Sequence, residues 1–179
     1  MLTNRVESHS LRQRGFSVLE LVVVIAAISV LVVVALHYYY KLLVDVERST
    51  MELDLTTMRG VISLQVADHF AKGKLPDLKR LIHSNPVDLL DKKPVRYLGE
   101  ISYDELNDIE KGRWFFNAKE RVLVYLVKHQ LYFETDLEPP LRARFKIEPV
   151  YSQRTQQGRQ RYMTGLILKE QEPYRWLEP

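Results

Sequence analysis

Cysteine is absent from all 179 residues of the chain. No disulfide can therefore hold the fold, which must rely on core packing, and no cysteine thiolate can act as a nucleophile. Motifs of serine hydrolases, P-loop nucleotide-binding proteins and zinc peptidases are also missing, and the five histidines are scattered along the sequence. The sequence therefore argues against an enzyme, and it predicts no catalytic residue, metal ligand or cofactor.

The chain also lacks a large excess of either positive or negative charge. The formal net charge is +3 at pH 7, and much of this excess lies in residues 1–15, where Arg5, Arg12 and Arg14 outnumber Glu7. The rest of the chain is close to neutral, so it lacks the positive surplus that strong non-specific nucleic-acid binding requires. No nucleic-acid partner is expected.

Proline and glycine are missing between Phe16 and Arg59, which favours an uninterrupted helix. Its first part, from Phe16 to Leu36, is a mainly apolar run in which Glu20 is the only charged residue. At about 1.5 Å per residue this part can cross the roughly 30 Å core of a bilayer. The arginines before it are expected to stay in the cytoplasm, which predicts a single-pass protein whose remainder is exported.

Residues Arg14 to Glu20 (RGFSVLE) form the most specific motif of the chain. This junction resembles the class III signal of type IV pilins and of the pseudopilins of type II secretion. In that family a basic leader ends in Gly, the next residue is usually Phe, and Glu stands fifth in the mature chain. The resemblance implies that a prepilin peptidase cleaves between Gly15 and Phe16 and methylates the new amino group of Phe16. A plain signal anchor is the alternative, but it explains neither Glu20 nor the Gly-Phe junction.

The same resemblance implies a function as a minor pilin or pseudopilin subunit of a type IV pilus or type II secretion filament. Its expected partners are other pilin or pseudopilin subunits, the peptidase, and an inner-membrane platform protein with its ATPase system. In the filament, Glu20 of one subunit pairs with the Phe16 ammonium of a neighbour. The alternative is a single-span periplasmic binding or scaffold protein that does not polymerise. The choice between pilus and secretion filament stays open.

Three tyrosines and a lysine follow the apolar run: Tyr38, Tyr39, Tyr40 and Lys41. Such side chains favour the headgroup layer, so they are interpreted as the outer membrane-interface anchor, with a core aromatic cluster as the alternative. Three parts are therefore predicted. They are a cleaved cytoplasmic leader (1–15), a transmembrane and polymerisation helix (16–41), and a pilin-like periplasmic domain (42–179) anchored in a bacterial inner membrane.

A helical period continues beyond the membrane segment. Apolar residues recur there at spacings of three or four, at Met51, Leu55, Met58, Ile62, Val66 and Phe70. Charged residues such as Glu47 and Asp54 lie mostly off this stripe. One helix is predicted from Phe16 to Lys72, ended by Gly73, and the globular domain is expected to cover its apolar stripe. A coiled coil is the alternative.

The remaining sequence predicts short helices and then strands. Helices are expected at 77–84 and 103–109, with a turn at 87–90 between them, and Ser102 and Glu105 form a capping box for the second helix. The strand candidates are a hairpin of 114–117 and 121–127, then 131–134, 142–151 and 162–168. The predicted fold class is α+β: a long N-terminal helix, half transmembrane and half amphipathic, packed against an antiparallel sheet of about four strands.

Three other groups receive simpler interpretations. The acids Asp104, Glu105, Asp108 and Glu110 lack the calcium-loop pattern and fit a solvated helix. The polar segment 153–161 is interpreted as an exposed loop, because no aromatic residues alternate with its arginines. The C-terminal segment 173–177 is interpreted as a tail that docks on the domain, with a contact to another subunit as the alternative.

Overall fold

The computed structural model describes residues 17–153 and 161–179. The chain divides into two compact units, one ending at Tyr40 and the other formed by Lys41–Pro179. Helix α1 (Val18–Ala71) contributes residues to both units. The predicted leader and most of the predicted loop at 153–161 lie outside the described residues.

The first part of α1 carries the apolar run. By length and composition this helix could cross a membrane, and its most apolar window has no buried side chain. Val18 and Leu31, for example, are both exposed. The structure thus agrees with the prediction of an apolar N-terminal helix of membrane-spanning length.

The second part of α1 packs on the globular unit through one face. Its buried residues are Val44, Glu47, Met51, Leu55, Met58 and Ile62. The predicted stripe is therefore confirmed from Met51 to Ile62, and Val66 packs at its margin. Two predictions are wrong: Phe70 is 70% exposed, and Glu47, expected off the stripe, is only 4% exposed.

Helix α1 ends where its sequence predicts. The last helical residue is Ala71, and Gly73 follows with a φ of 68°. The Gly73 N–H donates to Phe70 O at 3.1 Å, and the Lys74 N–H donates to His69 O at 2.8 Å. A glycine adopts this left-handed conformation without the cost that a Cβ atom would add, so it terminates the helix and satisfies free carbonyl groups.

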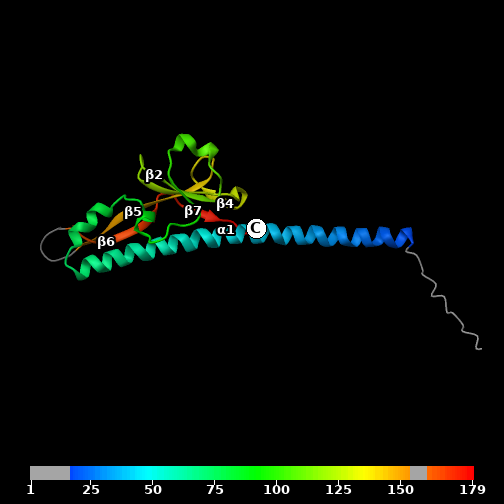
Figure 1. Cartoon of the computed structure of the whole chain (residues 1–179), viewed down its shortest axis with the longest axis horizontal. Helices are drawn as coiled ribbons and strands as arrows, with labels where there is room; N and C mark the ends of the chain where they lie inside the picture. Colours follow the sequence, from blue (N-terminus) through cyan, green and yellow to red (C-terminus); the bar gives the residue numbers. More distant parts are fainter. Residues whose placement is uncertain (1–16, 154–160) are drawn as a thin grey trace, which may run out of the picture. The chain divides into compact units, whose positions relative to one another are not determined.

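The globular unit contains a five-stranded sheet in the order β1-β2-β3-β5-β6 and a separate pair, β4-β7 (Figure 1). The strands are β1 (Tyr97–Glu100), β2 (Arg113–Asn117), β3 (Val122–Leu126), β4 (Phe133–Thr135), β5 (Arg142–Gln153), β6 (Arg161–Glu170) and β7 (Tyr174–Trp176). All pairs are antiparallel except β1-β2, which is parallel. The α+β prediction is confirmed, with one more strand in the main sheet than expected.

The centre of the sheet is covered on both faces. Trp114, Phe116, Leu123 and Tyr125 share one core with the buried residues of α1. The alternate residues, such as Phe115 and Val124, form a second core with Tyr103 and Leu106 of the short helix η3 (Tyr103–Asp108). Burial on both faces explains why β3 is a continuous apolar run rather than an alternating one.

The short helical segments are 3₁₀ helices. They are η1 (Leu75–Leu81), η2 (Pro86–Leu89), η3, and η4 (Gln130–Tyr132). The predicted capping box at Ser102 does not form. The Ser102 side chain makes no capping hydrogen bond, and its hydroxyl instead donates to Asp104 Oδ2 at 3.3 Å.

The C-terminal segment docks on the domain, as predicted. Strand β7 pairs with β4, where Trp176 lies opposite Phe133. The two rings make an edge contact with centroids 5.0 Å apart, and Trp176 is 8% exposed. The tail is therefore an integral part of the core.

Candidate assembly site

The N-terminal end of α1 holds the residues that the sequence singles out. Gly15 and Phe16, the predicted cleavage and methylation positions, lie outside the described residues. The structure begins at Ser17, whose Oγ accepts a hydrogen bond of 3.1 Å from the Glu20 N–H. Because α1 starts at Val18, Ser17 occupies the N-cap and Glu20 the third helical position.

Ser17 and Glu20 therefore match the spacing of a capping box. Glu20 is the acidic residue of the first helical turn, where the positive end of the helix dipole favours a carboxylate. The sequence analysis identified Glu20 but missed its capping partner, although a serine three residues before a glutamate is a recognisable signal. Stabilisation of the helix N-terminus is therefore a second physical reason for a carboxylate at position 20, besides pairing between subunits.

The Glu20 side chain is exposed. Within the part of the chain that the structure describes, it makes no ion pair and no side-chain hydrogen bond. The carboxylate can therefore accept hydrogen bonds from groups outside this chain. A positively charged amine in a dry environment is the partner that would best offset its desolvation.

The predicted interface residues are all exposed. Tyr38, Tyr39 and Tyr40 are each more than half exposed, and Lys41 is also exposed. Tyr39 and Tyr40 lie edge to face with ring centroids 6.2 Å apart. Their side chains therefore belong to no core of the described residues, and their position at a membrane surface stays a prediction.

A second polar site, which sequence reasoning missed, lies inside the globular unit. The buried carboxylate of Glu47 accepts hydrogen bonds from the Tyr125 hydroxyl at 3.1 Å and from the backbone N–H groups of Lys128 at 2.7 Å and His129 at 3.0 Å. His129 Nδ1 also lies 2.5 Å from Glu47 Oε2. Four contacts satisfy both carboxylate oxygens, as a buried charge requires.

This carboxylate fixes the segment after β3 to the helix. Burial and the neighbouring Glu47 carboxylate raise the pKa of the Tyr125 hydroxyl, so that it stays a donor. Gly112 lies beside the same site with a φ of 79°, and a Cβ atom there would be 4.0 Å from Glu47 Oε1. Both carboxylate oxygens of Glu47 are thus occupied by groups of its own chain, and the contacts join α1 to the end of β3.

A third polar contact ties α1 to β2. The Trp114 indole N–H donates to Asp54 Oδ2 at 2.8 Å. Burial raises the pKa of the Asp54 carboxyl, and the hydrogen bond from Trp114 partly opposes that rise. Trp114 itself is fully buried, so Asp54 satisfies an indole N–H that could not reach water.

The acidic segment near η3 shows no sign of a cation site in the residues whose placement is described. There, no group of three or more His, Cys, Asp or Glu residues has a geometry that could hold a metal ion. Glu110 instead pairs with Arg113, with Oε2 and Nη2 2.5 Å apart. Asp104 and Glu110 are exposed.

Comparison with known proteins yields no relative: no family model, no curated protein and no solved structure matches this chain.

Proposed function

We propose that this chain is a membrane-anchored subunit of a type IV filament system, either a minor pilin or a type II secretion pseudopilin. The observation that carries the proposal is the Gly15-Phe16 junction followed by an apolar run, to Leu36, in which Glu20 is the only charged residue. The same helix α1 continues into the globular unit, where it packs on a mainly antiparallel sheet. This combination suits a subunit that polymerises through its N-terminal helix.

Processing is the first step of the proposed function. The prepilin peptidase removes residues 1–15 on the cytoplasmic side and methylates the amino group of Phe16. The basic leader favours this orientation, because positively charged segments stay in the cytoplasm. The processed subunit waits in the bacterial inner membrane with its globular domain in the periplasm. An ATPase and a platform protein then move it into the filament.

Glu20 is proposed to act between subunits. In the bilayer or in a dry helix bundle, an isolated carboxylate and an isolated ammonium are each costly. Pairing Glu20 of one subunit with the Phe16 ammonium of its neighbour offsets both costs and sets the axial register. The exposed Glu20 side chain leaves the carboxylate available for this pairing.

A non-enzymatic role agrees with the composition of the site. The polar groups around Glu47 and Asp54 are hydrogen-bonded within the chain. They are therefore poorly placed to take up a substrate. We assign the chemistry of this protein to the enzymes that process and move it.

Two variants separate the proposed pairing from helix capping. Glu20→Gln removes the charge but keeps a residue that suits the third position of a capping box. Ser17→Ala removes the cap but keeps the carboxylate. If the charge acts between subunits, Glu20→Gln should be cleaved and inserted normally yet fail to assemble, whereas Ser17→Ala should assemble almost like the wild type.

Assembly is measured by crosslinking in the presence of the other filament subunits. Because the chain has no cysteine of its own, a single cysteine introduced near Phe16 is its only crosslinking position and reports contacts with neighbouring subunits. Normal crosslinking by Glu20→Gln together with failure of Ser17→Ala would make Glu20 a capping residue. The chain would then be better described as a single-span periplasmic scaffold.

A further inference from the structure

Strand β6 forms one edge of the five-stranded sheet. Its only strand partner among the described residues is β5, with Phe145 opposite Glu170 and Ile147 opposite Leu168. An edge strand presents one row of backbone N–H and C=O groups to its surroundings. Which residues form that row follows from the hydrogen bonds at the end of the ladder.

The Gln171 N–H donates to Arg144 O at 2.9 Å, so residue 171 directs its backbone toward β5. In an antiparallel ladder this direction alternates along the strand. Leu166, Leu168 and Glu170 therefore direct their N–H and C=O groups outward. The opposite strand agrees, because Ile147, the partner of Leu168, uses its carbonyl oxygen to accept from the His83 N–H rather than from β6.

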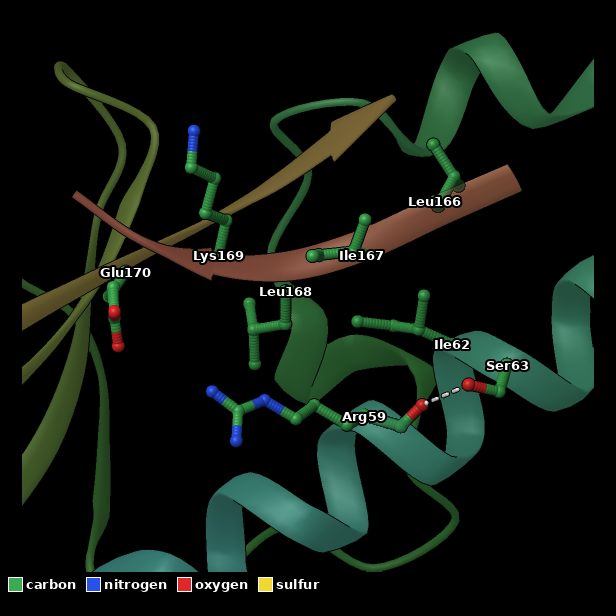
Figure 2. Close-up of a pocket in the computed structure, with 8 residues that line it drawn as sticks. All are labelled: Arg59, Ile62, Ser63, Leu166, Ile167, Leu168, Lys169 and Glu170. Carbon is green, nitrogen blue, oxygen red and sulfur yellow. Dashed lines mark hydrogen bonds between the residues drawn. The ribbon is translucent and has the colours of Figure 1, made fainter. Parts of the chain in front are cut away.

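These outward groups have no hydrogen-bond partner in the ranges 17–153 and 161–179. A groove of about 390 Å³ lies beside this strand and is lined by residues of both β6 and α1. Its lining comprises Leu166, Ile167, Leu168, Lys169 and Glu170 of β6, with Arg59, Ile62 and Ser63 of α1 (Figure 2). Consecutive residues of one strand can line a groove together only at the edge of the strand, because their side chains alternate between faces.

The opposite edge of the sheet is a poor site for strand addition. Strand β1 has only four residues, and its register with β2 shifts between Tyr97 and Glu100. Gly99 lies within it at a φ of 100°. Short, irregular edges of this kind resist pairing with another strand, whereas β6 has ten residues.

The groove also has a charge preference. Figure 2 shows the Arg59 side chain extending from α1 into the groove. Among the described residues the Arg59 guanidinium has no hydrogen bond or ion pair, while Lys169 already lies 3.4 Å from Glu148 Oε2. Glu170 lines the same groove, and no ion pair of its carboxylate is present among the described residues, so the groove offers one charge of each sign. A carboxylate that an incoming segment places at Arg59 would complement the guanidinium.

We propose that this groove binds an extended segment of another protein, which adds to β6 as a sixth strand and pairs one acidic side chain with Arg59. Backbone hydrogen bonds to Leu166, Leu168 and Glu170 supply the affinity, and Arg59 supplies the preference for acid. Ile62, Leu166 and Leu168 also line the groove, but each is at most 7% exposed, so the backbone hydrogen bonds and Arg59 carry the binding. This binding site does not depend on the proposed role in filament assembly.

The test uses the full chain in detergent micelles and a fluorescent heptapeptide of the sequence Thr-Val-Thr-Val-Glu-Val-Thr. Two matched peptides serve as controls, one with Lys in place of Glu and one with N-methyl groups that block the backbone donors on one edge. Fluorescence anisotropy should show saturable binding of the Glu peptide, weaker binding of the Lys peptide, and no binding of the N-methylated peptide.

Two variants test the geometry. Glu170→Pro deletes one outward N–H and should weaken binding about tenfold, whereas Glu170→Ala, which keeps that N–H, should not. Arg59→Gln should weaken binding of the Glu peptide about fivefold and abolish the preference over the Lys peptide. Arg48→Gln is its control, because Arg48 pairs with Glu52 outside the groove. Circular dichroism checks that each variant is folded.

Three results would overturn the proposal: no saturable binding of the Glu peptide at millimolar concentration, equal binding of the N-methylated peptide, or unchanged binding by Glu170→Pro. Sedimentation equilibrium of the full chain decides between a foreign strand and a second copy. The proposal predicts no self-association through β6. A dimer that Glu170→Pro dissociates would make the occupant a second copy and refute the assignment.

Discussion

The Tyr125 hydroxyl on β3 donates a hydrogen bond of 3.1 Å to Oε1 of Glu47 on α1, a residue 78 positions earlier in the chain. The same carboxylate accepts from the backbone of Lys128 and His129. One acidic side chain thus joins the helix to the end of a central strand and to the turn that follows it. The contact fixes the position of α1 along the sheet, which apolar packing alone specifies less strictly.

Glu47→Ala should destabilise the globular unit by about 3 kcal/mol, because the Tyr125 hydroxyl and the backbone N–H groups of Lys128 and His129 would lose a buried acceptor. Urea unfolding followed by Trp fluorescence measures this change, since Trp114 lies in the same core. The control is Asp45→Ala, an exposed acid two residues earlier on the same helix, which should change the unfolding free energy by less than about 0.5 kcal/mol. Equal effects of the two variants would show that the Glu47 contacts contribute little.

Asp54 should give the unfolding free energy a pH dependence. Burial raises the pKa of this carboxyl in the folded state, so the native chain holds the proton more tightly than the unfolded chain. The proton therefore stabilises the fold fully below the unfolded-state pKa, and this stabilisation is lost as the pH rises through the raised folded-state pKa. Asp54→Asn keeps an acceptor for the Trp114 indole N–H and should remove this component.

The measurement compares wild type and Asp54→Asn by urea unfolding between about pH 4 and pH 7. The unfolding free energy of the wild type minus that of Asp54→Asn should increase as the pH falls. Asp45→Asn serves as the exposed control and should show a smaller change. A difference that stays constant over this range would contradict the assigned environment of Asp54.

Two glycines in the globular unit should respond in opposite directions to alanine. Gly112 has a φ of 79°, so Gly112→Ala should cost about 1 kcal/mol of stability. Gly60 lies inside α1, and no atom lies within 4 Å of the position that an alanine Cβ would take, so Gly60→Ala should add about 0.5–1 kcal/mol. Thermal unfolding of both variants checks the prediction, and a gain from Gly112→Ala would refute the assigned conformation.

Much of the fold follows from local patterns. The spacing of Met51, Leu55 and Met58 predicts the buried face of α1, and the apolar run before and after 118–120 predicts the β2-β3 hairpin. Gly73 predicts the helix end. These features are visible because each depends on neighbours within a few residues, where periodicity and turn chemistry act directly.

Other features depend on distant partners and escaped prediction. Glu47 looks like a surface residue, because its hydrogen-bond partners lie 78 to 82 positions away. Phe70 continues the stripe, but periodicity identifies a face of the helix and not the extent of the surface that covers it. Strand β1 is short and interrupted by Gly99, so it lacks the alternation that marks a strand.

The candidate assembly site was likewise predictable only in part. The sequence alone identifies Glu20, because a charge within an apolar span is costly and therefore conspicuous. The structure adds the capping contact from Ser17, which supplies a local explanation that competes with pairing between subunits. Variants that change the charge of Glu20 and the capping by Ser17 separately distinguish pairing between subunits from helix capping.

The most direct test of the central claim is the mass of the N-terminal peptide of the protein isolated from its native membrane. Proteolysis followed by mass spectrometry should find a chain that begins at Phe16 and carries one methyl group on its amine, and Gly15→Val should abolish this product. A mature chain that begins at Met1, or at any residue other than Phe16, would contradict the assignment to the pilin and pseudopilin class.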